Sequence, residues 1–184
     1  MTSATPPLFY VVTGGPGAGK STLISALEAR GFAVAPEAGR RIIQEQQLQG
    51  GRALPWIDPH AFAQAMLDHD AAAFARLAGA AGPVFCDRGI PDAIGYLQLV
   101  GLAVPTAMWR AAEIHRYQES VFVCPPWRAI YTTDSERRQT WDVAERTYVT
   151  MVAVYTELGY RLVEVPRAPV DERVRFVTAA AGLR

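Results

Sequence analysis

A glycine-rich run near the N-terminus has the residue types and spacing of a phosphate-binding loop. The run Gly14-Gly15-Pro16-Gly17-Ala18-Gly19-Lys20-Ser21 fits the pattern G-x-x-x-x-G-K-[ST]. Its glycines let successive backbone N–H groups turn inward around a β-phosphate. We expect the only lysine of the chain, Lys20, to reach the β- and γ-phosphates and to be too exposed to contribute to packing, while the Ser21 hydroxyl binds Mg²⁺. The predicted nucleotide ligands are Gly15, Gly17, Ala18, Gly19, Lys20, Ser21 and Thr22.

The segments on either side of this run predict the strand and the helix that a phosphate loop must join. Residues 8–13 are an uninterrupted β-branched and aromatic run, which is typical of a strand buried on both faces. Residues 21–30 place Leu23, Ile24 and Leu27 on one side of a helix, and Gly31 follows as a left-handed cap. The alternative, a chance glycine-rich turn, is disfavoured because strand, loop and helix follow in the required order.

Asp87 and Arg88 follow the apolar residues 84–86, at the carboxyl end of another predicted strand. Ligands of open parallel α/β sheets bind beyond these ends, so we predict that Asp87 holds Mg²⁺ directly or through water. The planar guanidinium of Arg88 suits phosphate oxygens and is a candidate to clamp the transferring phosphoryl group or the acceptor. The alternative role of Arg88 is a salt bridge to Asp92 at the start of the next helix.

Glu37 closes a short predicted strand, residues 32–35, which we expect beside the strand that leads into the phosphate loop. A carboxylate at this place can deprotonate an acceptor hydroxyl or bind a metal ion. A helix-capping acid for residues 39–48 fits the position equally well. Arg40, one helical turn later, shares this ambiguity.

Arg137, Arg138 and Arg146 flank Trp141 in a polar segment between the fourth and fifth predicted strands. In a phosphoryl-transfer enzyme, a mobile lid at this place brings guanidinium groups onto the phosphates and excludes water. The alternative is a solvated helix whose arginines pair with acidic residues of the same segment.

Five predicted strands alternate with helices along the chain, at residues 8–13, 32–35, 84–86, 121–124 and 160–165. Such alternation implies an α/β fold with a parallel sheet and right-handed crossovers. A chain of 184 residues fits one domain with a sizeable core. We therefore predict a single domain over residues 8–184, preceded by a flexible tail over residues 1–7.

The composition argues against several partners. Lys plus Arg and Asp plus Glu each number 18, so no overall positive field favours nucleic acid. No apolar stretch approaches the length of a membrane span, and residues 1–7 lack the regions of a signal peptide. We expect a cytoplasmic protein, in which Cys86 and Cys124 are buried reduced thiols. The three histidines show no metal-ligand spacing, and no feature indicates an oligomeric state.

With these motifs assembled, the chain resembles the P-loop nucleoside and nucleotide kinase superfamily over nearly its whole length. Within it, the chain is most similar to the compact AAA-domain ATPase/kinase family related to bacterial ribosylnicotinamide kinase domains. The matching segments are T-G-G-P-G-A-G-K-S-T (13–22), P-E-A-G-R (36–40), F-C-D-R-G-I-P-D (85–92), T-D-S-E-R-R (133–138) and L-G-Y-R-L-V-E-V-P (158–166) with D-E-R after it. The resemblance implies a three-layer P-loop NTPase fold: a five-stranded parallel sheet flanked by helices, with a helical lid.

The resemblance also implies roles for individual residues. Pro36-Glu37-Ala38 is similar to the strand-two Pro-Glu element of deoxynucleoside kinases, in which the glutamate is the catalytic base, and Asp87-Arg88-Gly89 is similar to their acid–arginine pair. Glu37 thereby becomes the favoured base. The loop of residues 166–170, with Arg167 and Pro169, is implied to wrap an adenine. No N-K-x-D guanine-reading motif occurs, so ATP is the expected nucleotide.

Together these features predict an ATP- and Mg²⁺-dependent kinase that acts on a small hydroxyl- or phosphate-bearing metabolite, with a nucleoside as one candidate. Its predicted catalytic residues are Lys20, Glu37, Asp87, Arg88, Arg137 and Arg138, and its predicted metal ligands are Ser21 and Asp87. The alternatives are an ATPase whose nucleotide cycle operates a switch and a non-catalytic nucleotide-binding module. A base at Glu37 and an arginine lid favour transfer to an acceptor. Aromatic candidates for the acceptor pocket, each of which fits an ordinary core equally well, are Trp56, Tyr96, Trp109, Tyr117 and Trp127.

Overall fold

The computed structural model describes residues 8–131 and 140–183. The predicted tail over residues 1–7 and the predicted lid arginines Arg137 and Arg138 lie outside these described residues. The strands are β1 (Phe9–Gly14), β2 (Ala33–Ala35), β3 (Val84–Asp87), β4 (Ser120–Cys124) and β5 (Arg161–Glu164). They form one sheet in the order β2-β3-β1-β4-β5, and every pair is parallel. The predicted α/β fold is confirmed, and each predicted strand is found to within one residue at either end.

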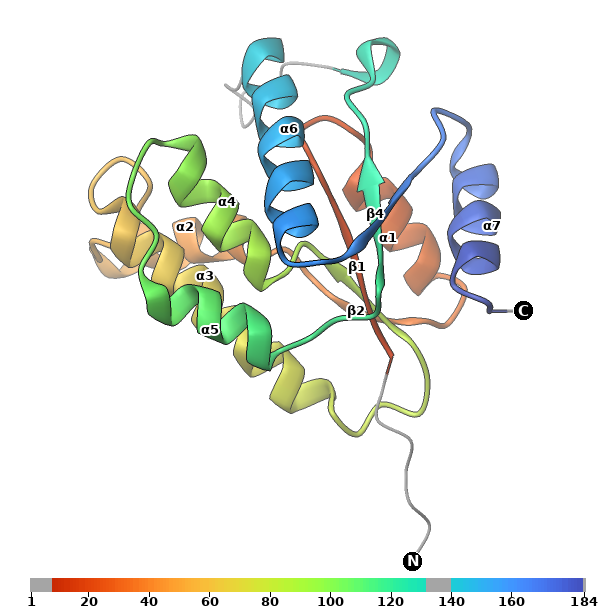
Figure 1. Cartoon of the computed structure of the whole chain (residues 1–184), viewed down its shortest axis with the longest axis horizontal. Helices are drawn as coiled ribbons and strands as arrows, with labels where there is room; N and C mark the ends of the chain where they lie inside the picture. The colour runs from red at the N-terminus through yellow and green to blue at the C-terminus, as the bar shows by residue number, and fades with distance from the viewer. Residues whose placement is uncertain (1–7, 132–139, 184) are drawn as a thin grey trace, which may run out of the picture.

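Helices cover both faces of this sheet (Figure 1). They are α1 (Lys20–Glu28), α2 (Ala38–Gln49), α3 (Pro59–Leu77), α4 (Ile90–Leu99), α5 (Thr106–Ile114), α6 (Trp141–Glu157) and α7 (Val170–Ala180), with a short 3₁₀ turn at Arg128–Ile130. Figure 1 shows α1 and α7 together on one side and α2 to α5 on the other. Among the described residues, no helix is long and apolar enough to cross a membrane.

The side-chain alternation of β1 explains why two separate cores form. Tyr10 and Val12 pack with apolar residues of α1 and α7, whereas Phe9 and Val11 pack with residues of α3 and α6 on the opposite face. Successive residues of a strand point to opposite faces, so a strand covered on both sides must be apolar throughout. A further core joins α2, α4 and α5 to α3 and α6. The phosphate loop thus begins at a strand that is buried along its whole length.

The position of β2 corrects one expectation. We expected the strand that ends near Glu37 to lie beside β1, but β3 lies between them and pairs with both. All four residues of β3 are buried. Of the three residues of β2, two are only partly buried. A short, partly exposed strand suits the edge of a sheet, and a fully buried strand suits its interior. Glu37 therefore approaches the phosphate loop from across β3.

Candidate active site

The loop between β1 and α1 has the backbone conformation that its glycines allow. Gly17 and Gly19 have φ values of 71° and 75°, in the left-handed region that side chains rarely enter. A Cβ atom on Gly17 would lie 2.6 Å from the ring of Tyr131, and one on Gly19 would lie 2.6 Å from Nη1 of Arg173. Glycine is therefore required at both positions by space as well as by backbone angle.

Lys20 is buried, which contradicts the expectation that it is too exposed to contribute to packing. Its side chain is 6% exposed, because it folds back over the loop and donates a hydrogen bond from Nζ to the Gly15 carbonyl at 2.7 Å. Burial lowers the pKa of Lys20 to about 8; the charge of Arg88 acts in the same direction, and Asp87 and Glu37 act against it. The ammonium is thus held in place with donors left for an anion.

Asp87 ends β3 with an oxygen that lacks a partner. Its Oδ1 atom is buried and accepts no hydrogen bond from any residue in the described ranges. Burial raises the pKa of Asp87 to about 6, and the charge of Lys20 offsets only part of this effect. A buried, unpaired carboxylate oxygen fits a role as ligand of a cation, which would satisfy it.

Ser21 supplies the second predicted ligand of that cation. It is exposed at the start of α1 and lines the same cleft as Lys20. Among the described residues, no three His, Cys, Asp or Glu side chains gather around one point. A Mg²⁺ ion held by Ser21 and Asp87 would take its remaining oxygen ligands from phosphates and water, as this ion commonly does.

Arg88 joins two carboxylates beside the loop. Its Nε donates to Glu37 Oε1 at 3.2 Å, and its Nη1 donates to Asp92 Oδ1 at 2.9 Å. The salt bridge to Asp92 that we considered as the alternative role is therefore present, together with a bond to the candidate base. Among the described residues, Arg88 is the one non-glycine with a positive φ, at 73°. Such backbone strain persists where surrounding contacts enforce it, and it is common at functional sites.

Glu37 is free to act outside the helix that it precedes. It occupies the N-cap position of α2, as the capping alternative requires, but its side chain makes no capping hydrogen bond. The side chain is 33% exposed. Burial acts to raise the pKa of Glu37, but the charges of Arg88 and Lys20, the hydrogen bond from Arg88 and the charge of Arg40 together hold this pKa below its ordinary value. Glu37 is thus an ionised and partly accessible carboxylate at neutral pH.

Asp92 is a central structural residue, although the sequence indicated only a salt bridge to Arg88 for it. Its Oδ1 also accepts from the Thr13 hydroxyl at 2.7 Å, while its Oδ2 accepts from the Gly89 amide at 3.0 Å and the Tyr155 hydroxyl at 2.7 Å. The signal that could have found it is its place in the first turn of α4, where acids bind free backbone amides. Asp92 ties β1, α4 and α6 together behind Arg88.

A cleft of about 340 Å³ opens beside the phosphate loop. Its lining residues are Gly17, Gly19, Lys20, Ser21, Thr22, Trp127, Ile130, Ala168, Pro169, Val170 and Arg173. Of the predicted nucleotide ligands, Gly15 and Ala18 lie in the loop without lining the cleft, and Arg167 instead donates from Nε to the Pro126 carbonyl at 3.0 Å. Trp127, one of the aromatic candidates for the acceptor pocket, and Arg173, to which no role was assigned, complete the wall.

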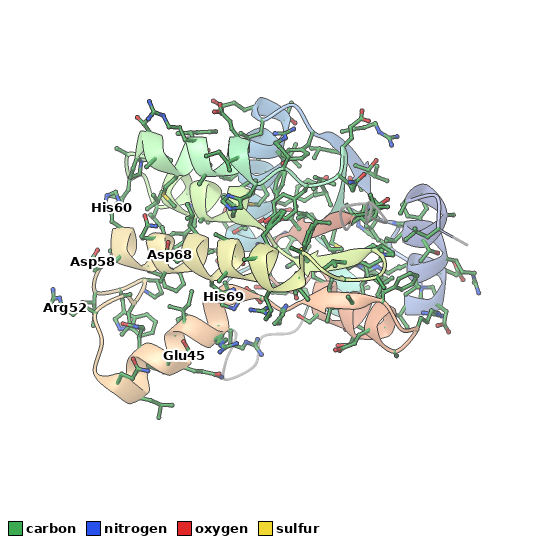
Figure 2. All side chains as sticks on the ribbon, turned by 90° about the horizontal axis from the view of Figure 1, so that it is seen from below. Glu45, Arg52, Asp58, His60, Asp68 and His69 are labelled. Carbon is green, nitrogen blue, oxygen red and sulfur yellow. The ribbon has the colours of Figure 1, made fainter. Side chains whose placement is uncertain are left out.

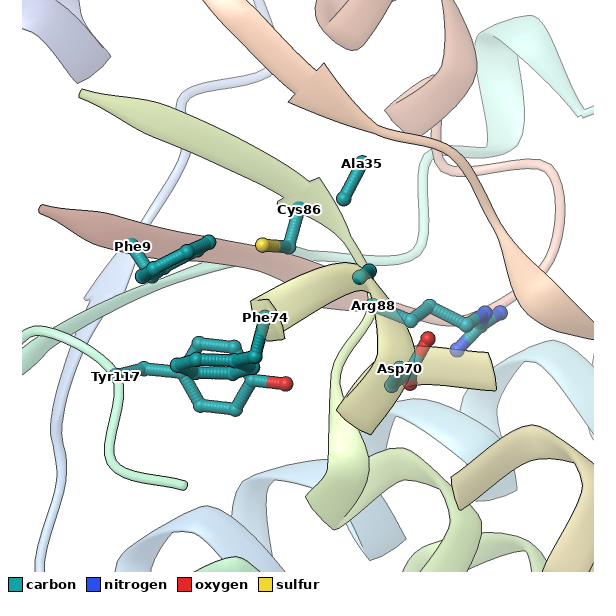
Figure 3. A pocket seen from close by; sticks show the side chains of 8 residues that line it. Phe9, Ala35, Asp70, Phe74, Cys86, Arg88 and Tyr117 are labelled. Atoms are coloured by element: carbon teal, nitrogen blue, oxygen red, sulfur yellow. The ribbon is translucent and has the colours of Figure 1, made fainter. Parts of the chain in front are cut away.

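A second, much smaller pocket lies behind Arg88 (Figure 3). It is lined by Asp70, Arg88, Cys86 and Tyr117 among others and has a volume of about 10 Å³. That volume holds at most about one water molecule, so this pocket is no substrate site. The Tyr117 hydroxyl accepts a hydrogen bond from the Ile90 amide at 3.0 Å, which places this aromatic candidate in the support of α4 and not in a substrate pocket.

The remaining candidates lie away from the loop. Trp56 is largely exposed between α2 and α3, and Tyr96 packs against Phe62 with ring centroids 5.2 Å apart. Figure 2 shows His60 at the outer end of α3 and His69 further along the same helix. Cys86 and Cys124 are buried free thiols, as predicted, and they lie on strands that β1 separates.

The fold and the loop are those of a P-loop protein. A family model described as an AAA domain matches residues 9–173, and the chain belongs to this family. The predicted resemblance is thereby confirmed. Comparison with curated proteins finds no match.

Solved structures of other proteins superpose on this chain. The NadR protein in complex with NR superposes with a TM-score of 0.71 at 15% identity, covering 97% of this chain and 52% of that chain. NadR with NAD and AMP-PNP gives 0.68 at 14% identity, covering 97% and 50%. Our chain thus spans about half of NadR.

Two further structures are matched over nearly their full length. Thymidylate kinase from Ehrlichia chaffeensis has a TM-score of 0.65 at 13% identity, with 96% of this chain and 100% of that chain covered. Deoxyadenosine kinase from M. mycoides, with the products dCMP and dCDP bound, has a TM-score of 0.66 at 12% identity, with 95% and 99% covered. Identities this low show a shared fold alone.

Proposed function

We propose that this protein is a Mg²⁺-dependent kinase that transfers the γ-phosphate of ATP to a small metabolite, with nucleosides and nucleotides as the first candidates. One observation carries the proposal. Glu37 is an ionised, partly exposed carboxylate that Arg88 holds at 3.2 Å, and its pKa is lowered in part by the charge of Lys20 in the phosphate loop. A nucleotide-binding module has no need of such a base, whereas transfer to a hydroxyl group does.

The cleft offers surfaces for the phosphates and for the base. Gly17, Gly19 and Lys20 form the phosphate end, where backbone amides and the helix N-terminus favour anions. Trp127 and Pro169 line the same cleft and offer flat apolar surfaces against which a purine can stack. NadR, a protein of the same fold, was solved with the nucleotides NAD and AMP-PNP, which supports ATP as the donor here.

The chemistry assigned to the site is a single in-line transfer. Glu37 removes the proton from the acceptor hydroxyl as its oxygen bonds to the γ-phosphorus, and the bond from that phosphorus to the bridging oxygen of ADP breaks. Lys20 and Arg88 stabilise the negative charge on the transferring group. Ser21 and Asp87 would hold a Mg²⁺ ion, which would supply further charge neutralisation. The names of the neighbouring kinases, which act on thymidylate and deoxyadenosine, support a nucleoside-like acceptor.

The predicted lid stays a prediction, but the residues around it have suitable positions. Tyr131 precedes and Trp141 follows residues 132–139, and their rings lie 5.3 Å apart in an edge-on contact. Arg128 lies over the same indole, 4.7 Å from its centroid, and Tyr131 lies against Gly17 of the loop. We propose that Arg137 and Arg138 act on the phosphates from between these flanks. Arg146 instead pairs with Asp142 at 3.0 Å on the exposed face of α6, as in the solvated-helix alternative.

The test is an acceptor screen with a base variant. ADP release from Mg-ATP is measured with nucleosides, nucleotides and vitamins, and we expect release that depends on one class of acceptor. Glu37→Gln should lower kcat by roughly 10²–10⁴-fold and leave Mg-ATP affinity near normal, because only proton removal is lost. The matched control is Glu45→Gln on the same helix, where the carboxylate pairs with exposed Arg41.

The alternatives have their own outcomes in this screen. Hydrolysis without any acceptor, unchanged in the Glu37→Gln variant, would identify an ATPase. Tight ATP binding with no turnover in any mixture would identify a non-catalytic module. Either result would overturn the kinase proposal.

A further inference from the structure

The C-terminal helix α7 places a buried arginine directly against the phosphate loop. Arg173 is 3% exposed. Its Nη1 donates to the Gly19 carbonyl at 3.0 Å, and its Nη2 donates to the Ala18 carbonyl at 3.1 Å and to Sγ of Cys124 at 3.2 Å. One planar guanidinium thus holds two consecutive carbonyl groups of the loop, a geometry that the flexible ammonium of lysine does not reproduce.

Holding these carbonyl groups fixes the orientation of the amides that follow them. In a planar trans peptide the C=O and N–H groups point in opposite directions. The Ala18 carbonyl shares its peptide plane with the Gly19 amide, and the Gly19 carbonyl shares its plane with the Lys20 amide. With both carbonyl groups turned toward Arg173, the N–H groups of Gly19 and Lys20 point away from it.

The close fit between Gly19 and Arg173 is built into the loop. A Cβ atom at Gly19 would lie 2.6 Å from Nη1 of Arg173, so the absence of a side chain there is what allows the contact. The same guanidinium lies 5.9 Å from the centroid of the Trp127 ring. Arg173 therefore binds the phosphate loop and also lies over the Trp127 ring in the wall of the cleft.

The charge balance around Arg173 is unlike that of a residue kept for stability alone. Among the described residues, no carboxylate forms an ion pair with Arg173, and its buried Nε has no hydrogen-bond partner. A buried charge balanced only by carbonyl groups and a thiol is costly to the fold. The cost is offset when the same cleft receives a polyanion.

We propose that Arg173 is the positioning residue of the phosphate loop. By holding the Ala18 and Gly19 carbonyls it presents the Gly19 and Lys20 amides to the polyphosphate of the bound nucleotide. This inference rests on the proposed function only in that the cleft binds a nucleoside triphosphate.

The experiment measures binding of inorganic tripolyphosphate and of ATP to the full chain by calorimetry. Arg173→Met keeps the bulk and removes the donors, and it should weaken tripolyphosphate binding at least about tenfold, as expected for losing hydrogen bonds to a charged group. Arg175→Met is the matched control, since Arg175 is exposed on the same helix; it should stay within about twofold of wild type. Circular dichroism establishes that each variant is folded at the temperature used.

Arg173→Lys separates positioning from simple attraction. It keeps the positive charge but not the planar fork, so binding should remain clearly weaker than in wild type. Wild-type affinity in Arg173→Lys would overturn the proposal, and this variant decides the matter if Arg173→Met does not fold. Wild-type affinity in a folded Arg173→Met would overturn it too. Failure of the wild-type chain to bind either tripolyphosphate or ATP would overturn the proposed function together with this inference.

Discussion

Two buried aspartates, Asp87 and Asp92, lie close together behind the phosphate loop and differ in how their oxygens are satisfied. Asp92 is 1% exposed, and each of its oxygens accepts two hydrogen bonds. Asp87 is 6% exposed, yet its Oδ1 accepts none from the described residues. A native fold rarely leaves a buried oxygen unpaired without a reason. The comparison separates a carboxylate that holds the structure from one that is kept open for a ligand.

The cations beside these aspartates show the same division. Burial opposes the charge of Arg88, but the charges of Glu37, Asp92 and Asp87 outweigh it, so the pKa of Arg88 is raised. Lys20 is also buried, and its pKa is lowered to about 8. Arg88 is neutralised by neighbouring carboxylates, whereas Lys20 carries a charge that the free protein stabilises poorly.

The largest effect should come from Lys20→Met, which removes the charge that contributes most to stabilising ionised Asp87. Phosphoryl transfer should fall by at least roughly 10³-fold, because a preorganised cation on the transferring group is lost. Turnover is measured with the acceptor found in the screen, and circular dichroism checks the fold because Lys20 is buried. Wild-type turnover in a folded variant would show that Lys20 does not act on the transferring phosphoryl group.

Asp92→Asn should destabilise the fold by about 3 kcal/mol, since it breaks a buried, fully hydrogen-bonded charge network. The melting temperature should fall by roughly 6–12 °C for a chain of this size. Asp68→Asn is the control, because Asp68 is exposed on α3 and accepts one hydrogen bond from Gln64. A melting temperature unchanged in Asp92→Asn would show that the four hydrogen bonds contribute nothing net.

Asp87→Asn should have the opposite effect on stability to Asp92→Asn and should stabilise the ligand-free protein. The pKa of Asp87 is raised from 3.8 to about 6 by burial, so the stability gained from its protonation is present below pH 3.8 and is lost as the pH rises through about 6. The neutral asparagine should therefore add about 3 kcal/mol at pH 7.5 and almost nothing below about pH 3. Thermal melts of both proteins across this range measure the difference. A constant difference at every pH would show that Asp87 titrates elsewhere.

The smallest effect concerns the metal. Asp87→Asn should raise the Mg²⁺ concentration needed for half-maximal activity by roughly tenfold, because a nearby negative charge is lost. The measurement is a Mg²⁺ titration of turnover at saturating ATP. An unchanged requirement would assign the unpaired oxygen of Asp87 to another ligand.

Local patterns in the sequence predicted the strands and the loop because each depends on neighbouring residues. Signals of this kind are the glycine run, the apolar strand residues before it and the acid that ends β3. The position of β2 at the edge was not predictable in the same way, since strand order depends on how far each strand is buried after folding. Glu37 reached the site from across β3 nonetheless, because the carboxyl ends of parallel strands share one edge.

The residues that sequence analysis missed act over long separations. Thr13 and Asp92 are 79 residues apart, and Arg173 is 154 residues from Gly19. No spacing rule connects such pairs. The burial of Lys20 was missed for a related reason, because a P-loop motif identifies the ammonium but not the way its side chain folds back onto the Gly15 carbonyl.

The contact between Gly19 and Arg173 also bears on the order in which the chain is synthesised. Translation proceeds from the N-terminus, so the glycine loop is made before α7. A nascent chain that has not reached α7 contains the whole loop without the two hydrogen bonds that hold its carbonyl groups. Contacts between such distant segments form late in folding. The phosphate loop is therefore synthesised before α7 and becomes fully ordered only when that helix docks.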